Sequence, residues 1–204
     1  MKVKFTKGEL KRQRDALRQY ERYLPTLQLK KQQLQAEILR QLIALEEKRR
    51  DEVKRRHSIE NWAGLFSDPG IDISRWIRPK EIVCNRRNIA GVDLPVFGQV
   101  KFDLAEYDLF SAPLWVDNAI EAVRSLACLR EEIKVLEKAM AVLRRELRIT
   151  TQRVNLFEKV KIPEAEEAIR LIKIYIGDQM ANAVGRSKIA KRKIEGVVLE
   201  EVAA

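Results

Sequence analysis

Apolar side chains recur every seven residues through the C-terminal part of the sequence. The recurring positions are Leu126, Ile133, Met140, Leu147 and Val154. Each is followed after three residues by a second position: Leu129, Leu136, Leu143, Thr150 and Phe157. This is the a and d spacing of a coiled coil, in which a helix buries a narrow stripe against a partner helix. We therefore predict a coiled-coil helix over residues 120–196 that needs a second helix to be stable.

The N-terminal part carries a weaker form of the same pattern. Leu10, Leu17 and Leu24 recur at sevens, and Lys31 and Gln41 interrupt the stripe further along. We predict a second coiled-coil helix over residues 1–60. Because the chain must reverse between the two helices, they are expected to pair antiparallel. The predicted fold class is mainly α, a long antiparallel two-helix left-handed coiled coil with a small central lobe that contains a short β-hairpin.

Two prolines fall within the predicted helices. Pro163 lies where the apolar stripe shifts by one residue, because after Phe157 it resumes at Ile162. Proline has no backbone N–H and crowds the carbonyl four residues earlier, so it kinks or ends a helix. We expect a kink at Pro163 and a local bend at Pro25.

The middle of the sequence, residues 61–119, has a different composition. It contains all three tryptophans, four of the six prolines and four of the six phenylalanines. The runs EIVC (81–84) and VKFDL (100–104) favour strands, and in the second run Val100, Phe102 and Leu104 alternate onto one face. NIAGVDLPVFG (88–98) has the glycine and proline content of a turn region. We predict a hairpin-bearing lobe here, and a frayed tail over residues 197–204.

Charge is unevenly distributed along the chain. Charged residues make up 34% of the sequence and the net charge is +10. The first 60 residues carry 17 Lys/Arg against 9 Asp/Glu, whereas residues 61–120 carry 6 against 8. Basic clusters at 48–56, 144–148 and 188–193 could contact phosphates. Acidic residues interleave with the first two clusters, and stacking aromatics are missing from all three, so solvated helix faces are the favoured interpretation and no nucleic-acid partner is expected.

The sequence has few groups that could support catalysis. It lacks a GxxxxGK[ST] phosphate loop and a GxGxxG turn, and its single histidine, His57, lies in a polar stretch. Cys84 and Cys128 are too few and too far apart to indicate a disulfide framework. No apolar run approaches the roughly 18 residues of a membrane span. We expect a cytoplasmic, non-enzymatic protein with no catalytic, cofactor-binding or metal-binding residues and no direct membrane insertion.

Two segments carry a family resemblance. RVNLFEKVKIPEAEEAIRLIKIYI (153–176) is similar to the C-terminal helix of the D subunit of vacuolar/archaeal-type (V/A-type) rotary ATPases. NIAGVDLP is similar to that family's N-x-x-G-V-x-x-P turn, and FTKGEL (5–10) resembles its N-terminal start. The matching residues are Arg153, Val154, Asn155, Glu158, Ile162, Pro163, Glu166 and Ile169, together with Asn88, Gly91, Val92 and Pro95.

The resemblance implies a rotor shaft that transmits torque between a nucleotide-hydrolysing hexamer and the ion-translocating ring in the membrane. It implies as partners the alternating catalytic and nucleotide-binding subunits of that hexamer, the F subunit on the side of the shaft, and a funnel-shaped subunit that links its foot to the ring. The shaft itself would make no bonds and would be peripheral to the membrane. Two alternatives stay open: a free-standing coiled-coil adaptor or tether, and a basic nucleic-acid-binding helical protein.

Overall fold

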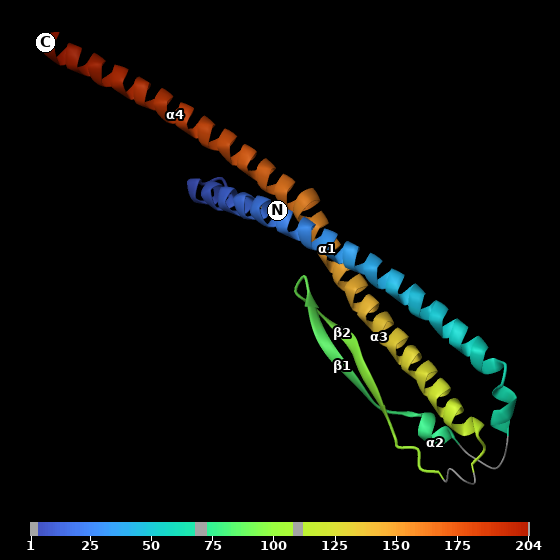
Figure 1. The fold of residues 1–204 in the computed structure, drawn as a ribbon. Coiled ribbons are helices and arrows are strands. Elements are labelled where there is room, and N and C mark those ends of the chain that lie inside the picture. Colours follow the sequence, from blue (N-terminus) through green and yellow to red (C-terminus); the bar gives the residue numbers. More distant parts are fainter. Residues whose placement is uncertain (1–3, 68–72, 108–111, 204) are drawn as a thin grey trace. The chain divides into compact units, whose positions relative to one another are not determined.

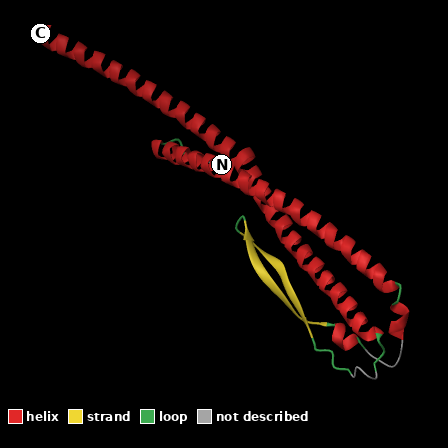
Figure 2. Ribbon diagram, in the orientation of Figure 1, coloured by secondary structure: helices red, strands yellow, loops and turns green. Residues whose placement is uncertain are grey.

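The structure, a computed structural model, describes residues 4–67, 73–107 and 112–203. It is mainly helical and contains one β-hairpin, which confirms the predicted fold class (Figures 1 and 2). The elements in chain order are α1 (Lys7–Glu60), the 3₁₀ helix η1 (Ala63–Ser67), α2 (Ser74–Ile77), β1 (Pro79–Ile89), β2 (Val92–Phe102), α3 (Trp115–Leu156), the π-helical turn η2 (Phe157–Lys161) and α4 (Ile162–Ala203).

The chain divides into two compact units. Unit 1 combines the chain up to Gln28 with the chain from Gln152 onwards, and unit 2 comprises Leu29–Thr151. The long helix α1 supplies residues to both units. Each unit therefore pairs a part of α1 with a helical segment from the C-terminal half of the sequence.

A side-chain cap starts α1 in unit 1. The hydroxyl of Thr6 accepts a hydrogen bond from the backbone N–H of Glu9 at 3.2 Å, and the carbonyl of Thr6 accepts one from the N–H of Leu10 at 3.0 Å. A threonine followed after three residues by glutamate is the usual signal for a helix start, because it satisfies N–H groups that have no partner within the helix. The FTKGEL segment thus sets where α1 begins.

In unit 1, aromatic rings mark how α1 meets the C-terminal helices. Phe5 packs against Tyr175 with ring centroids 5.0 Å apart, and Tyr20 packs against Phe157 at 5.3 Å. Residue numbers rise along α1 while those of the partners fall, so the two segments run antiparallel. The side chains buried in this unit are Val154, Ala165, Ala168, Ile169 and Ile172.

In unit 2, α1 and α3 also run antiparallel. Leu34 shares a core cluster with Leu143, and further along α1 Leu45 shares one with Met140 and Ile133. Each fully buried side chain of this size contributes about 1.5–3 kcal/mol from the removal of apolar surface from water. The predicted pairing between an N-terminal and a C-terminal helix is thus present in the unit where the heptad pattern is strongest.

The hairpin of unit 2 consists of two 11-residue strands, which is longer than the sequence predicts. Its turn is only Ala90 and Gly91, with φ angles of 52° and 74°. Positive φ at both central residues is the type I′ geometry, whose twist matches that of the flanking strands. Most of the glycine- and proline-containing segment 88–98 therefore lies in the strands, and Leu104, expected in the second strand, lies beyond its end and is exposed.

The tip of the hairpin packs onto the helix pair. Val92 and Leu94 are 7% and 2% exposed, and they share a cluster with Leu34 of α1 and with Ala139 and Leu143 of α3. The hairpin follows α3 in Figure 1. Unit 2 therefore has a third layer, which contacts Ala139, a position outside the heptad pattern of α3, as well as the heptad residue Leu143.

A second apolar cluster lies where α3 begins. Its buried members are Ile73, Val116, Ala119 and Ile120. Around them the ring of Phe66 contacts the rings of Trp62 and Trp115, and Trp76 contacts Tyr107. This cluster accounts for the concentration of tryptophan in the middle of the sequence, since all three tryptophans pack against it.

Candidate functional site

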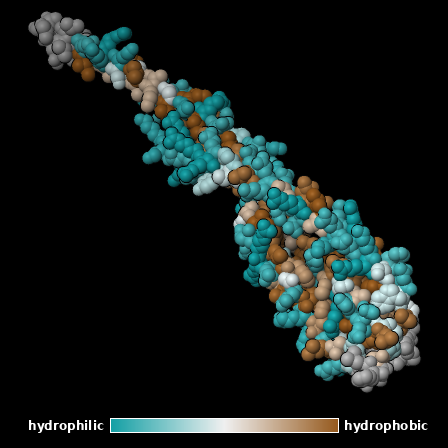
Figure 3. Space-filling model, viewed as in Figure 1, coloured by the Kyte–Doolittle hydropathy of each residue, from teal (hydrophilic) through white to brown (hydrophobic). Residues whose placement is uncertain are grey.

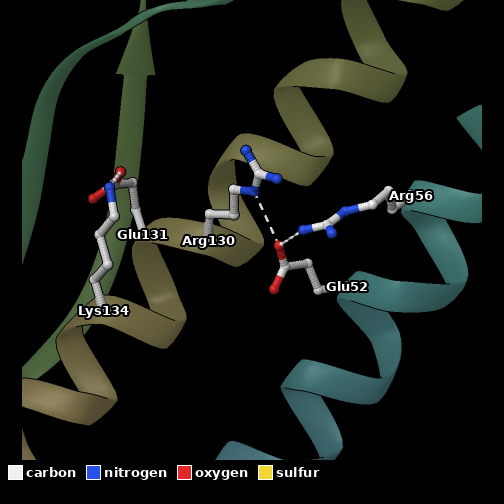
Figure 4. Close-up of polar contacts among 5 residues, drawn as sticks. All are labelled: Glu52, Arg56, Arg130, Glu131 and Lys134. Carbon is white, nitrogen blue, oxygen red and sulfur yellow. Dashed lines mark hydrogen bonds and ion pairs between the residues drawn. The ribbon is translucent and has the colours of Figure 1, made fainter. Parts of the chain in front are cut away.

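The main polar contact between the paired helices of unit 2 is centred on Glu52. One of its carboxylate oxygens accepts hydrogen bonds from Arg130 Nε of α3 and from Arg56 of α1, both at 2.9 Å (Figure 4). The Glu52 side chain is 17% exposed. The hydrogen bond from Arg130, with a smaller contribution from Arg56, holds the pKa of Glu52 below its ordinary value. Glu52 therefore stays ionised and links the two helices at ordinary pH.

Two further ion pairs cross between the same helices. Lys48 lies 2.9 Å from Glu132, and Arg49 lies 2.5 Å from Glu137. These contacts reverse part of the sequence interpretation, because Lys48, Arg49 and Glu52 belong to the cluster 48–56, for which the sequence favours a solvated face. The missed signal is charge complementarity, since α3 carries glutamates at the positions that an antiparallel partner brings opposite these basic residues.

All of the heptad positions of α3 are buried or half-buried. Ile133, Met140, Leu143 and Val154 are at most 7% exposed, whereas Leu126 and Leu147 are half-buried. On α1, Leu10, Leu17 and Leu24 are also half-buried. Thr150 is the polar residue of the stripe and is 3% exposed.

The shift in the apolar stripe coincides with a π-helical turn. In η2 the N–H of Ile162 donates to the carbonyl of Phe157, five residues earlier rather than four. A π turn accommodates one extra residue, which matches the one-residue displacement of the stripe after Phe157. Pro163 follows at once, and because it lacks an N–H it cannot donate to Lys159 as an α-helical residue would. The turn keeps Ile169 and Ile172 in the buried stripe despite the shift in sequence.

The polar residues of the C-terminal motif point to solvent. Arg153, Asn155 and Glu158 are exposed, and within the part of the chain that is described they make no hydrogen bond or ion pair. Val154 is 3% exposed and Ile162 is half-buried, so the apolar residues of the motif belong to the stripe. Pro163 is exposed. The motif thus combines a buried side with a free polar side.

The second motif builds the hairpin turn. The side-chain oxygen of Asn88 accepts a hydrogen bond from the Gly91 N–H at 3.1 Å, and its amide nitrogen donates to Asp93 at 2.6 Å. Gly91 supplies the positive φ of the turn without steric cost. Pro95 is half-buried in β2. The motif therefore serves the conformation of the turn, which places Val92 against the helices.

No arrangement for catalysis is found in the described residues. Among them, no group of three His, Cys, Asp or Glu side chains could hold a metal ion. His57 is exposed and lies 3.7 Å from Glu60 of the same helix. Cys84 is exposed, and burial raises the pKa of the half-buried Cys128. A search of the same residues finds no helix with the length and apolar character that a bilayer crossing requires.

Comparison with known proteins gives one family. A family model described as the D subunit of ATP synthase matches residues 9–192. The V-type ATP synthase D subunit of Borreliella burgdorferi is 45% identical over 193 residues, which covers 95% of this chain and 95% of that protein. The V-type ATP synthase D subunit of Chlamydia pneumoniae is 34% identical over 197 residues, covering 96% and 94%. The family resemblance is confirmed, and the chain belongs to the ATP synthase D-subunit family.

Proposed function

We propose that this chain is the central rotor shaft of a V/A-type ATPase or ATP synthase and transmits torque between the nucleotide-binding hexamer and the membrane ring. The observation that carries the proposal is the antiparallel packing of α1 on C-terminal helical segments, seen in each of the two units of a D-subunit family member. Interdigitated side chains resist twisting because protein cores are packed as densely as organic crystals. A paired helix is thus suited to carry a turning force.

The surface also supports this role. Hydrophilic side chains cover most of the face shown in Figure 3, and apolar ones are scattered among them. Exposed ion pairs contribute only about 0–1 kcal/mol each, because water competes for the charges. A surface of long Lys and Arg side chains could therefore meet acidic groups of a surrounding sleeve in successive positions without becoming fixed in one. The free motif residues Arg153, Asn155 and Glu158 belong to this surface in unit 1.

Exposed apolar residues support the proposed neighbours. On α1 in unit 2, Leu39 and Ile43 are 61% and 52% exposed and lie one helical turn apart, which suits a helix of the F subunit packing on the side of the shaft. Leu104 and Leu114 are 84% and 95% exposed in the segment that joins the hairpin to α3, which suits the funnel-shaped subunit. The catalytic and nucleotide-binding subunits of the hexamer would surround the shaft and perform the ATP chemistry. In this assembly the chain makes no bonds itself and is peripheral to the membrane.

Co-purification tests the proposal. The chain is co-expressed with the catalytic, nucleotide-binding and F subunits of its own complex, and the product is weighed by native mass spectrometry. We expect one copy per hexamer, and ATP-driven rotation of a bead attached to the chain. A stable homodimer that does not bind the hexamer would instead support a free-standing tether and would contradict the proposed role as a shaft.

A further inference from the structure

Both ends of the hairpin meet a single arginine of α3. Arg124 Nε donates at 2.9 Å to the carbonyl of Trp76, which lies in α2, the short helix that precedes β1. Its terminal nitrogen donates to the carbonyl of Asp103 at 2.6 Å, just after β2. The guanidinium carbon also lies 5.2 Å from the centre of the Phe102 ring. One planar group thus contacts the segment before β1, the segment after β2 and the ring of Phe102.

The geometry of the guanidinium group explains why these contacts fix the direction in which the hairpin runs. Its N–H groups form a rigid planar fork, so two acceptors bound at once fix the orientation of the group and of the segments bearing them. Lys80 pairs with Asp103 at 2.6 Å, but that contact joins the hairpin's own two ends. Trp76 and Ala105 pack on the apolar cluster at the start of α3, outside the paired strands. Arg124 contacts the ring of Phe102, the last residue of the ladder, and the carbonyls of Trp76 and Asp103 just outside the ladder, so it ties the base of the hairpin to α3.

The other end of the hairpin is fixed on the same helix. Leu94 is buried against Ala139 and Leu143 of α3. From Arg124 to Leu143 the helix rises roughly 28 Å at 1.5 Å per residue. From Leu94 to Phe102 the strand covers roughly 26 Å at 3.3 Å per residue. The two spans are similar, so the strands lie along α3 with both the tip and the base of the hairpin on that helix.

We infer that Arg124 is a positioning residue that sets the direction of the hairpin along α3, so that the hairpin turns as one body with the helix pair. Without Arg124 the tip remains packed, but the base of the ladder can swing about the apolar cluster. A force applied to the exposed middle of the hairpin would then bend the hairpin and would not be transmitted fully to α3. The part of the inference that concerns load rests on the proposed function.

Spin-label distances test the positioning role in the full chain. Cys84 is exposed in the middle of β1 and takes one nitroxide, and Lys138→Cys, at an exposed position of α3, takes the second. Cys128→Ala removes the other thiol. We expect a narrow distance distribution with Arg124 present and one roughly two-fold wider in Arg124→Gln, because two charge-assisted bonds are lost. An unchanged width in Arg124→Gln overturns the inference.

Two variants keep the result interpretable. Arg130→Gln makes the same chemical change on α3, but its partner is Glu52 of α1, so the Cys84 distances should not change. Arg124→Lys keeps the charge but replaces the rigid planar fork with a compact ammonium on a flexible stem, which does not fix the orientation of the two carbonyls, so it should broaden the distribution as well. If circular dichroism shows that Arg124→Gln has lost helix, the width of the distance distribution in Arg124→Lys tests the positioning role instead.

The assembled complex tests the mechanical consequence. We expect Arg124→Gln to lower the number of ions moved per ATP hydrolysed, and Lys134→Gln, whose contact is Glu131 of the same helix, to leave it unchanged. Broadened distances with an unchanged ion-to-ATP ratio would overturn the mechanical role of the hairpin. If the unaltered chain does not assemble with the hexamer, the proposed function fails, whereas the distance measurements still decide the role of Arg124.

Discussion

At the scale of single residues, the most telling side chains bridge segments that are far apart in the sequence. Glu52 links α1 to α3 through Arg130, and Arg124 links α3 to the hairpin. Neither role follows from residue type, because a chain with 34% charged residues offers many equivalent candidates. Only the register between the segments decides which charges meet.

Replacing the bridging carboxylate should weaken unit 2. We expect Glu52→Gln to lower the free energy of unfolding by about 1 kcal/mol, because a charged acceptor of two arginines becomes a neutral one. Because the pKa of Glu52 is lowered in the folded state, its contribution is present above the ordinary value of 4.5 and is lost as pH falls through the lowered value. The difference in the free energy of unfolding between the parent protein and Glu52→Gln should therefore become smaller below pH 4.5.

Urea unfolding at several pH values measures this gap. Glu46→Gln is a suitable control, since Glu46 has a single contact, 4.0 Å to Arg50 on its own helix. A gap that is the same at pH 3 and pH 7 would show that the carboxylate charge is not what stabilises the pairing.

A glycine in β2 should tolerate no side chain. The ladder shifts register between Val83 and Cys84, and Gly98 is the extra residue on the opposite strand. A Cβ on Gly98 would lie 2.8 Å from the backbone carbonyl oxygen of Val83, which cannot move without disturbing the ladder. We expect Gly98→Ala to destabilise the hairpin by about 1–3 kcal/mol.

Hydrogen exchange of β1 and β2 reports on this change, and faster exchange is expected in the variant. Gly177→Ala serves as the comparison, because a Cβ there meets no atom within 4 Å. Equal protection of both strands in Gly98→Ala and the parent would contradict the expected clash.

At the scale of elements, the turn η2 adjusts the phase of the buried stripe. The stripe of α3 ends at Phe157, and that of α4 begins one residue later than a seven-residue repeat allows. The π-helical bond from Ile162 to Phe157 absorbs this residue. The sequence predicts an irregularity at Pro163. The extra residue lies in the π turn just before that proline.

Adding a further residue to η2 should rotate the following stripe out of contact. Inserting one alanine after the exposed Glu158 gives the turn a second extra residue, and each residue of an α-helix turns the chain by about 100°. Ile169 and Ile172 would then leave the buried side, so we expect a lower melting temperature by circular dichroism. Lys159→Ala changes the same turn without changing its length and should melt like the parent.

If the insertion variant melted at the same temperature as Lys159→Ala, the number of residues in η2 would have no part in the register. The expected result would also explain why the motif places Val154 and Ile162 eight residues apart, since both contribute to one stripe only with the π turn between them.

The sequence predicts the α3 stripe well, because a coiled-coil helix buries positions at a fixed repeat. It does not predict Val135 and Ala139, which are 5% and 2% exposed although they lie outside the repeat. For Ala139 the cause is the hairpin, whose Leu94 covers another face of α3. The spacing of four residues between Val135 and Ala139 was the available signal.

The sequence predicts the hairpin itself but makes it too short. Strand prediction relies on side chains that alternate between two faces, and one extra residue reverses that alternation. The extra Gly98 does so in the middle of β2, and the glycine and proline content of the stretch before it indicates a turn although most of that stretch lies in strands. The interhelical ion pairs were missed as well, because the heptad pattern fixes which faces meet, and the complementary charges of the two helices become a signal only once their antiparallel register is known.

At the scale of the whole molecule, the last part of α4 differs from the rest of the helical chain. From Gly177 to Glu195 every side chain is exposed, whereas the preceding stripe is buried up to Ile172. Isolated helices gain little stability from backbone hydrogen bonds alone, and most depend on packing of an apolar face. Met180 and Val184 are more than half exposed, and no described part of the chain covers them.

Hydrogen exchange should separate this segment from the paired helices. In the isolated chain, we expect the amides of 177–195 to exchange much faster than those of 129–150, because local opening there breaks no side-chain packing. In the proposed complex they should become protected. Mass spectrometry of peptides from both samples measures the difference, and equal protection in the isolated chain would contradict the expectation.

The contacts across the two helix pairs differ in kind, and dissolved salt should therefore act on them differently. Across the pair in unit 2 lie ion pairs at Glu52, Lys48 and Arg49, whereas the described cross-contacts of unit 1 are rings, Phe5 on Tyr175 and Tyr20 on Phe157. Mobile ions screen exposed charges over about 10 Å at 0.1 M and leave apolar contacts in place. Raising the concentration of sodium chloride should speed amide exchange around residues 48–52 but not around Tyr20. Ionic strength would then weaken the helix pair of unit 2 and leave the helix pair of unit 1 unchanged.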